Sequence, residues 1–272
     1  MKNVFKSLIP ALLAVVGSIL PASAYTVDTI AVSGPGLGHP MPALVIVPDC
    51  EAGARYPSVY LLHGYGGDAD NWYGHQPRIG ELADEYGMVI VTPGVGNTWY
   101  FDAVGKPDQQ IETFMTQTLV PYIDRNYPTV DSRAKRAVAG LSMGGHGAYR
   151  LAARHPQLFG AAGTISGAVD IRPFAERWKI AEILGPREQN PEVWDQATVA
   201  TMIDRIKAAD LALSIDCGAD DFFAGVNEQL HRDLLEAGVP HDYTSRPGGH
   251  SWKYWNNAVL YQLLFFNEFF NR

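Results

Sequence analysis

The sequence predicts an α/β fold in which a mostly parallel central sheet is covered by helices on both faces. Short apolar segments typical of buried strands alternate along the chain with segments whose apolar residues repeat at helical spacing. The length also fits one large domain of this class, because setting aside residues 1–24 leaves 248 of the 272 residues. No internal repeat, linker or low-complexity tract divides residues 25–272.

Residues 1–24 have the pattern of a secretory signal peptide. Two lysines precede a mostly apolar run over residues 8–20, and the small residues at 22–24 are typical of a cleavage site. The apolar run is interrupted by Pro10 and is shorter than the roughly 20 residues that span a bilayer. We therefore expect a secreted or periplasmic protein, cleaved after Ala24, with no stable membrane insertion.

The chain is acidic and poor in cysteine. Its net charge is −8, which becomes −10 once the two lysines of the first 24 residues are removed. This charge argues against nucleic acid or an anionic membrane surface as a partner. Cys50 and Cys217 can pair in an oxidising compartment, but Cys217 ends an apolar strand pattern, which favours a small buried residue over a disulfide.

The first half of the chain supplies four expected strands and two expected helices. A Gly/Pro-rich turn joins the two opening strands, a helix separates two buried strands, and a longer helical pattern follows. In chain order the expected strands are 26–32, 44–47, 58–62 and 88–92, and the expected helices are 79–86 and 111–125.

The second half continues the alternation. A short strand pattern at 137–139 leads into a helical pattern at 148–153. The later expected strands are 161–165, 211–216 and 242–246, and the last helices are 222–237 and 252–270. Polar residues interrupt the aromatic-rich final helix, which indicates packing on the core and not a membrane segment. Residues 170–197 lack clear periodicity and contain Trp178 and Trp194, so we interpret them as an insertion over the active face.

The residues Gly140-Leu141-Ser142-Met143-Gly144 join an expected strand to an expected helix. A serine between glycines at such a junction is the nucleophile-elbow signature of α/β-hydrolases. The glycines are needed because the turn is too tight for side chains, and the strained serine then projects its hydroxyl above the sheet. The pattern predicts that Ser142 is a nucleophile.

A serine nucleophile needs a base and an acid that orients the base, and in α/β-hydrolases these follow in the order acid, then histidine. His250 lies in a glycine-containing loop between the last expected strand and the final helix, and His241 is the competing candidate. Asp216, Asp220 and Asp221 all lie near the end of the preceding strand. Spacing alone leaves the acid open, because an aspartate before a helix can also serve as its cap.

The third requirement is a pair of backbone N–H groups that stabilise the negative charge on the carbonyl oxygen, worth on the order of 3 kcal/mol each. One is expected from Met143, directly after the nucleophile. The other is expected from the Gly-rich loop at residues 63–67, which follows a buried strand.

These motifs together resemble the esterase D family, which groups feruloyl and acetyl-xylan esterases, tributyrin esterases, S-formylglutathione hydrolases and mycolyltransferases. The resemblance covers nearly all of residues 25–272. The matching positions are Tyr60-Leu61-Leu62-His63-Gly64 with Trp72, Trp99-Tyr100-Phe101-Asp102, Glu112-Thr113-Phe114, residues 139–145, His155-Pro156 with Phe159, Ser166-Gly167, residues 217–222 and Gly249-His250-Ser251-Trp252.

The resemblance implies an α/β-hydrolase fold and a catalytic set of Ser142, Asp221 and His250. It also implies that Tyr65 and Met143 supply the oxyanion donors. These residues would carry out ester cleavage through an acyl-enzyme, with no metal or organic cofactor.

Further positions are implied outside the catalytic set. Glu112 is expected to support the site structurally. Trp99 and Asp102 are expected to border the substrate cleft, although a core position for Trp99 fits equally well. Trp178 and Trp252 are additional candidate substrate contacts, since aromatic rings can stack on a phenolic acid or simply pack in the core.

The expected function is that of a secreted serine carboxylesterase acting on a small or polysaccharide-linked ester, foremost a feruloyl or acetyl ester of plant polysaccharide. The signal peptide disfavours a cytoplasmic thioester substrate. The alternatives are an acyltransferase of the mycolyltransferase type, a general short-chain esterase of the tributyrin type and, last, a non-catalytic carbohydrate-binding protein.

Overall fold

The computed structural model describes residues 25–49 and 51–272. The predicted signal peptide and Cys50 lie outside the described residues, so neither that prediction nor the Cys50–Cys217 pairing is tested. Cys217 itself is buried. Within the described part of the chain, no helix is both long and apolar enough to cross a membrane.

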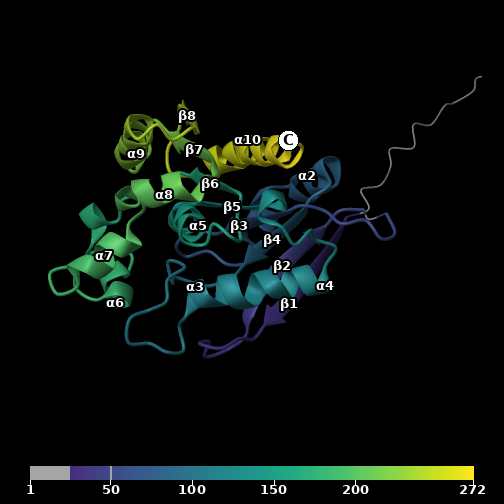
Figure 1. Ribbon diagram of the computed structural model, residues 1–272, viewed down its shortest axis with the longest axis horizontal. Helices are drawn as coiled ribbons and strands as arrows, with labels where there is room; N and C mark the ends of the chain where they lie inside the picture. The colour runs from purple at the N-terminus through teal and green to yellow at the C-terminus, as the bar shows by residue number, and fades with distance from the viewer. Residues whose placement is uncertain (1–24, 50) are drawn as a thin grey trace, which may run out of the picture.

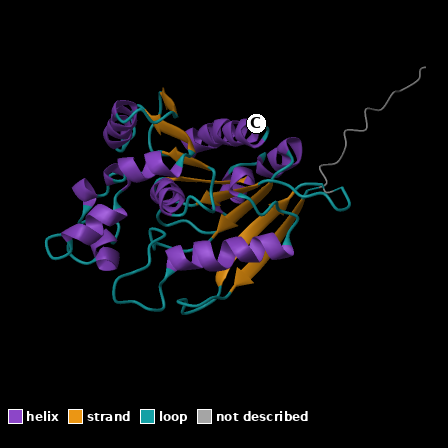
Figure 2. Cartoon of the chain, viewed as in Figure 1, coloured by secondary structure: helices purple, strands orange, loops and turns teal. Residues whose placement is uncertain are grey.

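An eight-stranded sheet runs through the centre of the molecule, and Figure 2 shows its strands between helices. The strand order is β1-β2-β4-β3-β5-β6-β7-β8. β1 and β2 pair antiparallel, as do β2 and β4, and all other neighbours are parallel. The strands are β1 Thr26–Val32, β2 Met41–Val47, β3 Ser58–Leu62, β4 Val89–Pro93, β5 Arg136–Leu141, β6 Ala161–Ile165, β7 Ala212–Gly218 and β8 Asp242–Arg246. The predicted α/β class is confirmed.

Two apolar cores lie on opposite faces of this sheet. Because side chains alternate along a strand, Tyr60 and Leu62 of β3 enter one core, whereas Val59 and Leu61 enter the other. α2 and α10 cover the second face, and α4 and α5 cover the first (Figure 1). The helices are α1 Asn71–His75, α2 Ile79–Tyr86, α3 Ile111–Thr113, α4 Val120–Asn126, α5 Met143–Arg154, α6 Ile180–Leu184, α7 Pro191–Ala197, α8 Ile203–Ala209, α9 Ala224–Glu236 and α10 Trp252–Phe270.

The expected helix over 111–125 is present as three consecutive segments. α3 passes into a π-helical turn over Phe114–Leu119, and α4 follows. Pro121 lies in the first turn of α4, and its missing N–H interrupts the regular hydrogen-bond ladder at this point. The expected helix over 222–237 instead begins at Ala224, because Phe222 and Phe223 belong to the turn before it.

The insertion at 170–197 contains α6 and α7, which the sequence did not predict. Two hydrogen bonds attach it to the segment between β4 and α3. The Trp99 indole donates to the Trp178 carbonyl at 3.0 Å, and the Val104 amide donates to the Ile183 carbonyl at 3.0 Å. The insertion is thereby held beside the carboxyl edge of the sheet.

Glu112 connects α3 to α5, the helix that follows Ser142. Its carboxylate is nearly buried and contacts Arg150 at 2.8 Å, Arg154 at 2.7 Å and His155 at 2.8 Å. Burial alone would raise the pKa of Glu112, but the hydrogen bond from His155 and the charge of Arg150 outweigh burial and hold this pKa well below its usual range. Glu112 is thus a structural anchor of α5.

Replacing Glu112 with glutamine is expected to lower the free energy of unfolding at pH 7 by about 3 kcal/mol, because the buried Arg150 loses its charge partner. The pKa of Glu112 is lower in the folded chain than in the unfolded chain. Its stabilisation is therefore complete above the unfolded value of about 4.3 and is lost as the pH falls below it. The cost of the substitution, measured by urea denaturation, should accordingly shrink below about pH 4.

Glu228→Gln is the matched control, since Glu228 pairs with Arg232 on the exposed face of α9. Its cost should stay under about 1 kcal/mol. Equal costs for the two variants would contradict an anchoring role for Glu112.

Candidate active site

Ser142 occupies a strained turn between β5 and α5. Its backbone angles are φ 55° and ψ −118°, and its amide donates to the Ile165 carbonyl at 2.9 Å. The flanking glycines have no room for side chains. A Cβ on Gly140 would lie 2.5 Å from the carbonyl carbon of Gly144, and one on Gly144 would lie 2.4 Å from the Leu62 carbonyl oxygen. This turn places the serine hydroxyl at the carboxyl edge of the sheet.

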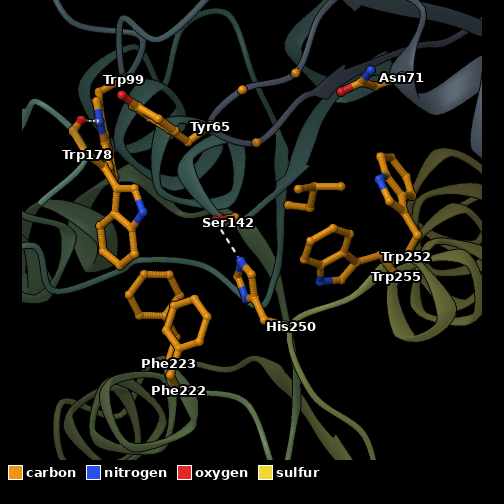
Figure 3. A pocket seen from close by; sticks show the side chains of 14 residues that line it. Tyr65, Asn71, Trp99, Ser142, Trp178, Phe222, Phe223, His250, Trp252 and Trp255 are labelled. Atoms are coloured by element: carbon orange, nitrogen blue, oxygen red, sulfur yellow. Dashed lines mark hydrogen bonds between the residues drawn. The ribbon is translucent and has the colours of Figure 1, made fainter.

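Ser142, His250 and Asp221 form one chain of hydrogen bonds. The Ser142 hydroxyl lies 3.0 Å from His250 Nε2 (Figure 3). On the other side of the ring, His250 Nδ1 lies 2.9 Å from Asp221 Oδ2. Because Nδ1 faces a carboxylate, it carries the ring proton, and Nε2 is left free to accept the serine proton. The Asp221 side chain is fully buried, whereas that of His250 is 16% exposed.

The other two candidate acids have structural contacts. Asp220 accepts the amide proton of Gly248 at 3.1 Å and so holds the loop that carries His250. Asp216 accepts from the Tyr254 hydroxyl at 2.6 Å and pairs with Arg246. Neither carboxylate contacts the imidazole that approaches Ser142.

His241 lies at the opposite edge of the sheet. It directly precedes β8, and Asp242 at the start of β8 pairs with Ser214 in the amino-terminal half of the parallel strand β7. Its ring contacts His231 at 2.8 Å. His241 is therefore not placed to reach Ser142.

The loop after β3 packs directly on the serine turn. A Cβ on Gly64 would lie 2.5 Å from the Leu141 side chain and 3.4 Å from Ser142 Cβ. The next residue, Tyr65, lines the same pocket as Ser142. Its amide, like that of Met143, donates to no backbone carbonyl among the loop and turn contacts of the described residues. Met143 directly follows Ser142 as the first residue of α5, where helix N–H groups have no partner within the helix, so Tyr65 and Met143 stay the predicted oxyanion donors.

His63 holds this loop through its neutral ring. The Val95 amide donates to His63 Nε2 at 3.1 Å, which leaves the proton on Nδ1, and Nδ1 donates to the Gly64 carbonyl at 2.8 Å. Burial lowers the pKa of His63 and keeps the ring neutral. Asn97 adds a second support, because its side-chain oxygen accepts the Gly66 amide at 2.6 Å.

The hydroxyl of Ser142 opens into a cavity of about 260 Å³ with aromatic walls. Trp99 and Trp178 lie on one side of the serine together with Phe222 and Phe223, and Trp252 and Trp255 lie on the other side (Figure 3). Phe222 is 56% exposed, and its ring lies 5.9 Å from that of Trp178 at an interplanar angle of 22°. A flat apolar group would find aromatic surface on both sides of the nucleophile.

Three of the four candidate substrate contacts line this cavity, namely Trp99, Trp178 and Trp252. Asp102 does not, which corrects the expectation that it borders the cleft. Its carboxylate accepts from the amide of Thr113 at 3.0 Å and from the Thr113 hydroxyl at 2.7 Å, and so supports α3. Trp194 is buried in the insertion, where its indole donates to the Gly185 carbonyl.

Four further residues line the cavity that were not predicted from the sequence, namely Asn71, Phe222, Phe223 and Trp255. The sequence pattern placed Phe222 and Phe223 in the expected helix over 222–237. The Asp221 side chain instead accepts the Phe223 amide at 2.8 Å, and the resulting turn places both rings near His250. The adjacent Cys-Gly-Ala-Asp-Asp sequence was the only signal that these residues lie beside the acid.

Residues 34–266 match the family described as "Putative esterase". The chain belongs to this esterase family. The match includes Ser142, Asp221 and His250, and it confirms the family resemblance inferred from the motifs.

Among esterases of known sequence, Esterase Rv1288 of Mycobacterium tuberculosis (strain ATCC 25618 / H37Rv) is 30% identical over 237 residues, 77% of this chain and 52% of that protein. The chain thus spans about half the length of this relative. The acetyl esterase of Caldicellulosiruptor saccharolyticus is 26% identical over 216 residues, 74% of this chain and 80% of that protein.

Among solved structures, a ferulic acid esterase is 30% identical, with a TM-score of 0.79 over 92% of this chain and 100% of that chain. This similarity agrees with the predicted α/β-hydrolase fold.

The contacts around His250 predict unequal effects of the two neighbouring aspartates on the reactivity of Ser142. With Asp221→Asn, labelling of Ser142 by a fluorophosphonate probe should slow by about 10⁴-fold, because the amide stabilises the wrong imidazole tautomer. With Asp220→Asn, the labelling rate should change by no more than a few-fold, since only the Gly248 contact is altered. Labelling rates are followed by mass spectrometry, and equal slowing by both variants would count against the assignment of Asp221.

Proposed function

We propose that this chain is a serine carboxylesterase that cleaves a feruloyl or acetyl ester of plant polysaccharide. The observation that carries the proposal is the unbroken hydrogen-bonded series Ser142–His250–Asp221, which opens into an aromatic cavity. Family membership supports ester hydrolysis, and the named relatives include an acetyl esterase and a ferulic acid esterase.

In the proposed reaction, His250 Nε2 removes the proton of the Ser142 hydroxyl as the oxygen attacks the ester carbonyl. The tetrahedral oxyanion accepts hydrogen bonds from the amides of Tyr65 and Met143, each worth on the order of 3 kcal/mol. The imidazolium then protonates the leaving alcohol, while Asp221 stabilises its charge. Water, deprotonated by His250, attacks the acyl-enzyme and releases the acid.

The aromatic walls favour a flat acyl group over a long flexible chain. Rings of Trp178 and Phe222 present neighbouring faces on one side of Ser142, where a phenolic acid can stack. An acetyl group is small enough to react in the same cavity. We further propose that residues 25–272 form the catalytic domain and that the segment 1–24 directs its export.

Transfer of the acyl group to an acceptor other than water is the alternative activity, because the same catalytic set serves acyltransferases. The two reactions differ only in what attacks the acyl-enzyme. Kinetics with methyl ferulate in the presence of added sugar alcohols separate them. Predominant release of free acid supports hydrolysis, and predominant formation of sugar esters supports transfer.

Replacing Ser142 with alanine is expected to reduce hydrolysis of p-nitrophenyl acetate, methyl ferulate and acetylated xylan by at least about 10³-fold, because no nucleophile remains. Circular dichroism should show an unchanged fold, since alanine adds no bulk to the turn. Wild-type protein should hydrolyse at least one ester of this panel. Retention of substantial activity in the alanine variant would rule out the proposed nucleophile.

Phe222→Ala is expected to lower the ratio of kcat/KM for methyl ferulate to that for p-nitrophenyl acetate by about tenfold, because loss of one aromatic face costs roughly 1.5 kcal/mol. The ratio removes any effect on His250 that is common to both esters. Leu235→Ala is the control, since Leu235 is 59% exposed on α9 and lines no part of the cavity. An unchanged ratio in Phe222→Ala would contradict acyl binding at this wall.

A further inference from the structure

A second cavity, of about 560 Å³, lies beside the serine site. Its walls come from the start of β2, the turn after β4, residues 106–109 and the α6 end of the insertion. β2, β4, β3 and β5 are consecutive in the sheet, and the start of antiparallel β2 adjoins the carboxyl end of β4. Both cavities therefore lie on the same edge of the sheet, side by side.

The two cavities meet at Gly67, which lines both. Beyond Gly67, Trp99 and Trp178 separate the two cavities, and the Trp99 indole donates a hydrogen bond to the Trp178 carbonyl. These two tryptophans line the serine site, whereas their chain neighbours Thr98 and Lys179 line the second cavity. At the junction, Gly66 has φ +80° and no atom within 4 Å of the position of a Cβ, so the space on that side of the loop is open.

The second cavity has a mixed polar and apolar lining and contains polar groups without protein partners. The Thr98 hydroxyl is buried and makes no hydrogen bond. Lys106, Lys179 and Glu182 also line the cavity, and within the described chain their side chains form no hydrogen bond or ion pair. The buried Thr98 hydroxyl lacks the partner that buried polar atoms in proteins nearly always have. Lys179 and Glu182 are exposed, so their side chains are free to contact a ligand from the solvent side.

The polar groups of this cavity suit a neutral polyhydroxylated ligand. Lysine and aspartate side chains occur together, so an anion would meet Asp68, Asp108 and Glu182, and a cation would meet two lysines. A sugar hydroxyl both donates and accepts, and therefore matches such a mixed set. Apolar side chains, among them Met41 and Ile183, supply surface for the C–H groups of a sugar ring.

We propose that the second cavity is a glycosyl subsite, which holds a neutral sugar of the ester substrate while the acyl group occupies the aromatic cavity. This inference rests on the proposed esterase function and adds to it the residues that contact the carbohydrate. Lys179 and Glu182 are the hydrogen-bonding residues contributed by the insertion, and the sugar reaches them across Gly67.

The first experiment compares kcat/KM for a feruloylated arabinoxylan oligosaccharide with that for methyl ferulate. In Lys179→Ala/Glu182→Ala this ratio should fall about tenfold, through KM, because roughly one or two hydrogen bonds to the sugar are lost. The control is Arg187→Ala/Glu188→Ala, which removes the same charges from exposed positions of the insertion that line neither cavity. The control should keep the wild-type ratio, and an unchanged ratio in the Lys179/Glu182 variant would overturn the subsite.

The second experiment needs no hydrolysis. Ser142→Ala protein is titrated calorimetrically with an unesterified xylo-oligosaccharide, which should bind, and adding Lys179→Ala/Glu182→Ala should weaken binding about tenfold. No binding, or equal binding by both proteins, would overturn the subsite. If instead wild-type protein hydrolyses no ester, the proposed esterase function fails, and the titration still decides whether the cavity binds sugar.

Discussion

The close packing of the serine turn against the loop after β3 is the contact on which the rest of the site depends. Gly144 lies so near the Leu62 and His63 carbonyls that a Cβ would approach them to 2.4 and 2.6 Å. The left-handed backbone of Ser142 costs on the order of 1–3 kcal/mol and persists only because the surrounding structure holds it. Here it is held by β5, which pairs with β3 and β6 in the middle of the sheet. The same packing sets Gly64, the residue before Tyr65, against the serine turn, where Tyr65 and Met143 are the proposed oxyanion donors.

The other half of the site comes from the ends of β7 and β8, and its precision depends on loop contacts. Asp220 holds the loop of His250 through Gly248, while the buried Asp221 fixes the imidazole itself. Aromatic rings then enclose the imidazole, with Phe222 at 4.3 Å and Trp255 at 4.8 Å between ring centres. Exclusion of water by these rings strengthens the charge-assisted contacts of the site. The rings that would bind an acyl group therefore also shape the environment of the proposed base.

Much of the fold could be predicted because buried strands and amphipathic helices have clear periodicity. The bounds expected for β3 and α10 agree with the structure. Ser142 and His250 could also be predicted from the sequence, since glycines mark the tight turns at strand ends in which they lie. Spacing in the sequence could not show whether Asp220 or Asp221 contacts His250, because this depends on which carboxylate the loop at Gly248 binds.

The cavity walls were harder to predict because they come from irregular segments. Trp99 and Trp178 were named as candidate contacts, but their positive φ angles of 56° and 50° leave no periodic signal that would place them in the walls. Phe222 matched a helical pattern, although it lies in the turn before α9. Asp102 belonged to a recognisable motif, yet its side chain supports α3 and not the cleft.

Detection of an acyl-enzyme tests the proposed role of Ser142 most directly. Protein is mixed rapidly with p-nitrophenyl acetate, quenched in acid, digested and analysed by mass spectrometry. We expect an added acetyl group on the peptide that contains Ser142, formed at least as fast as the steady-state turnover. Turnover without any adduct, or with the acetyl group on another residue, would contradict this role.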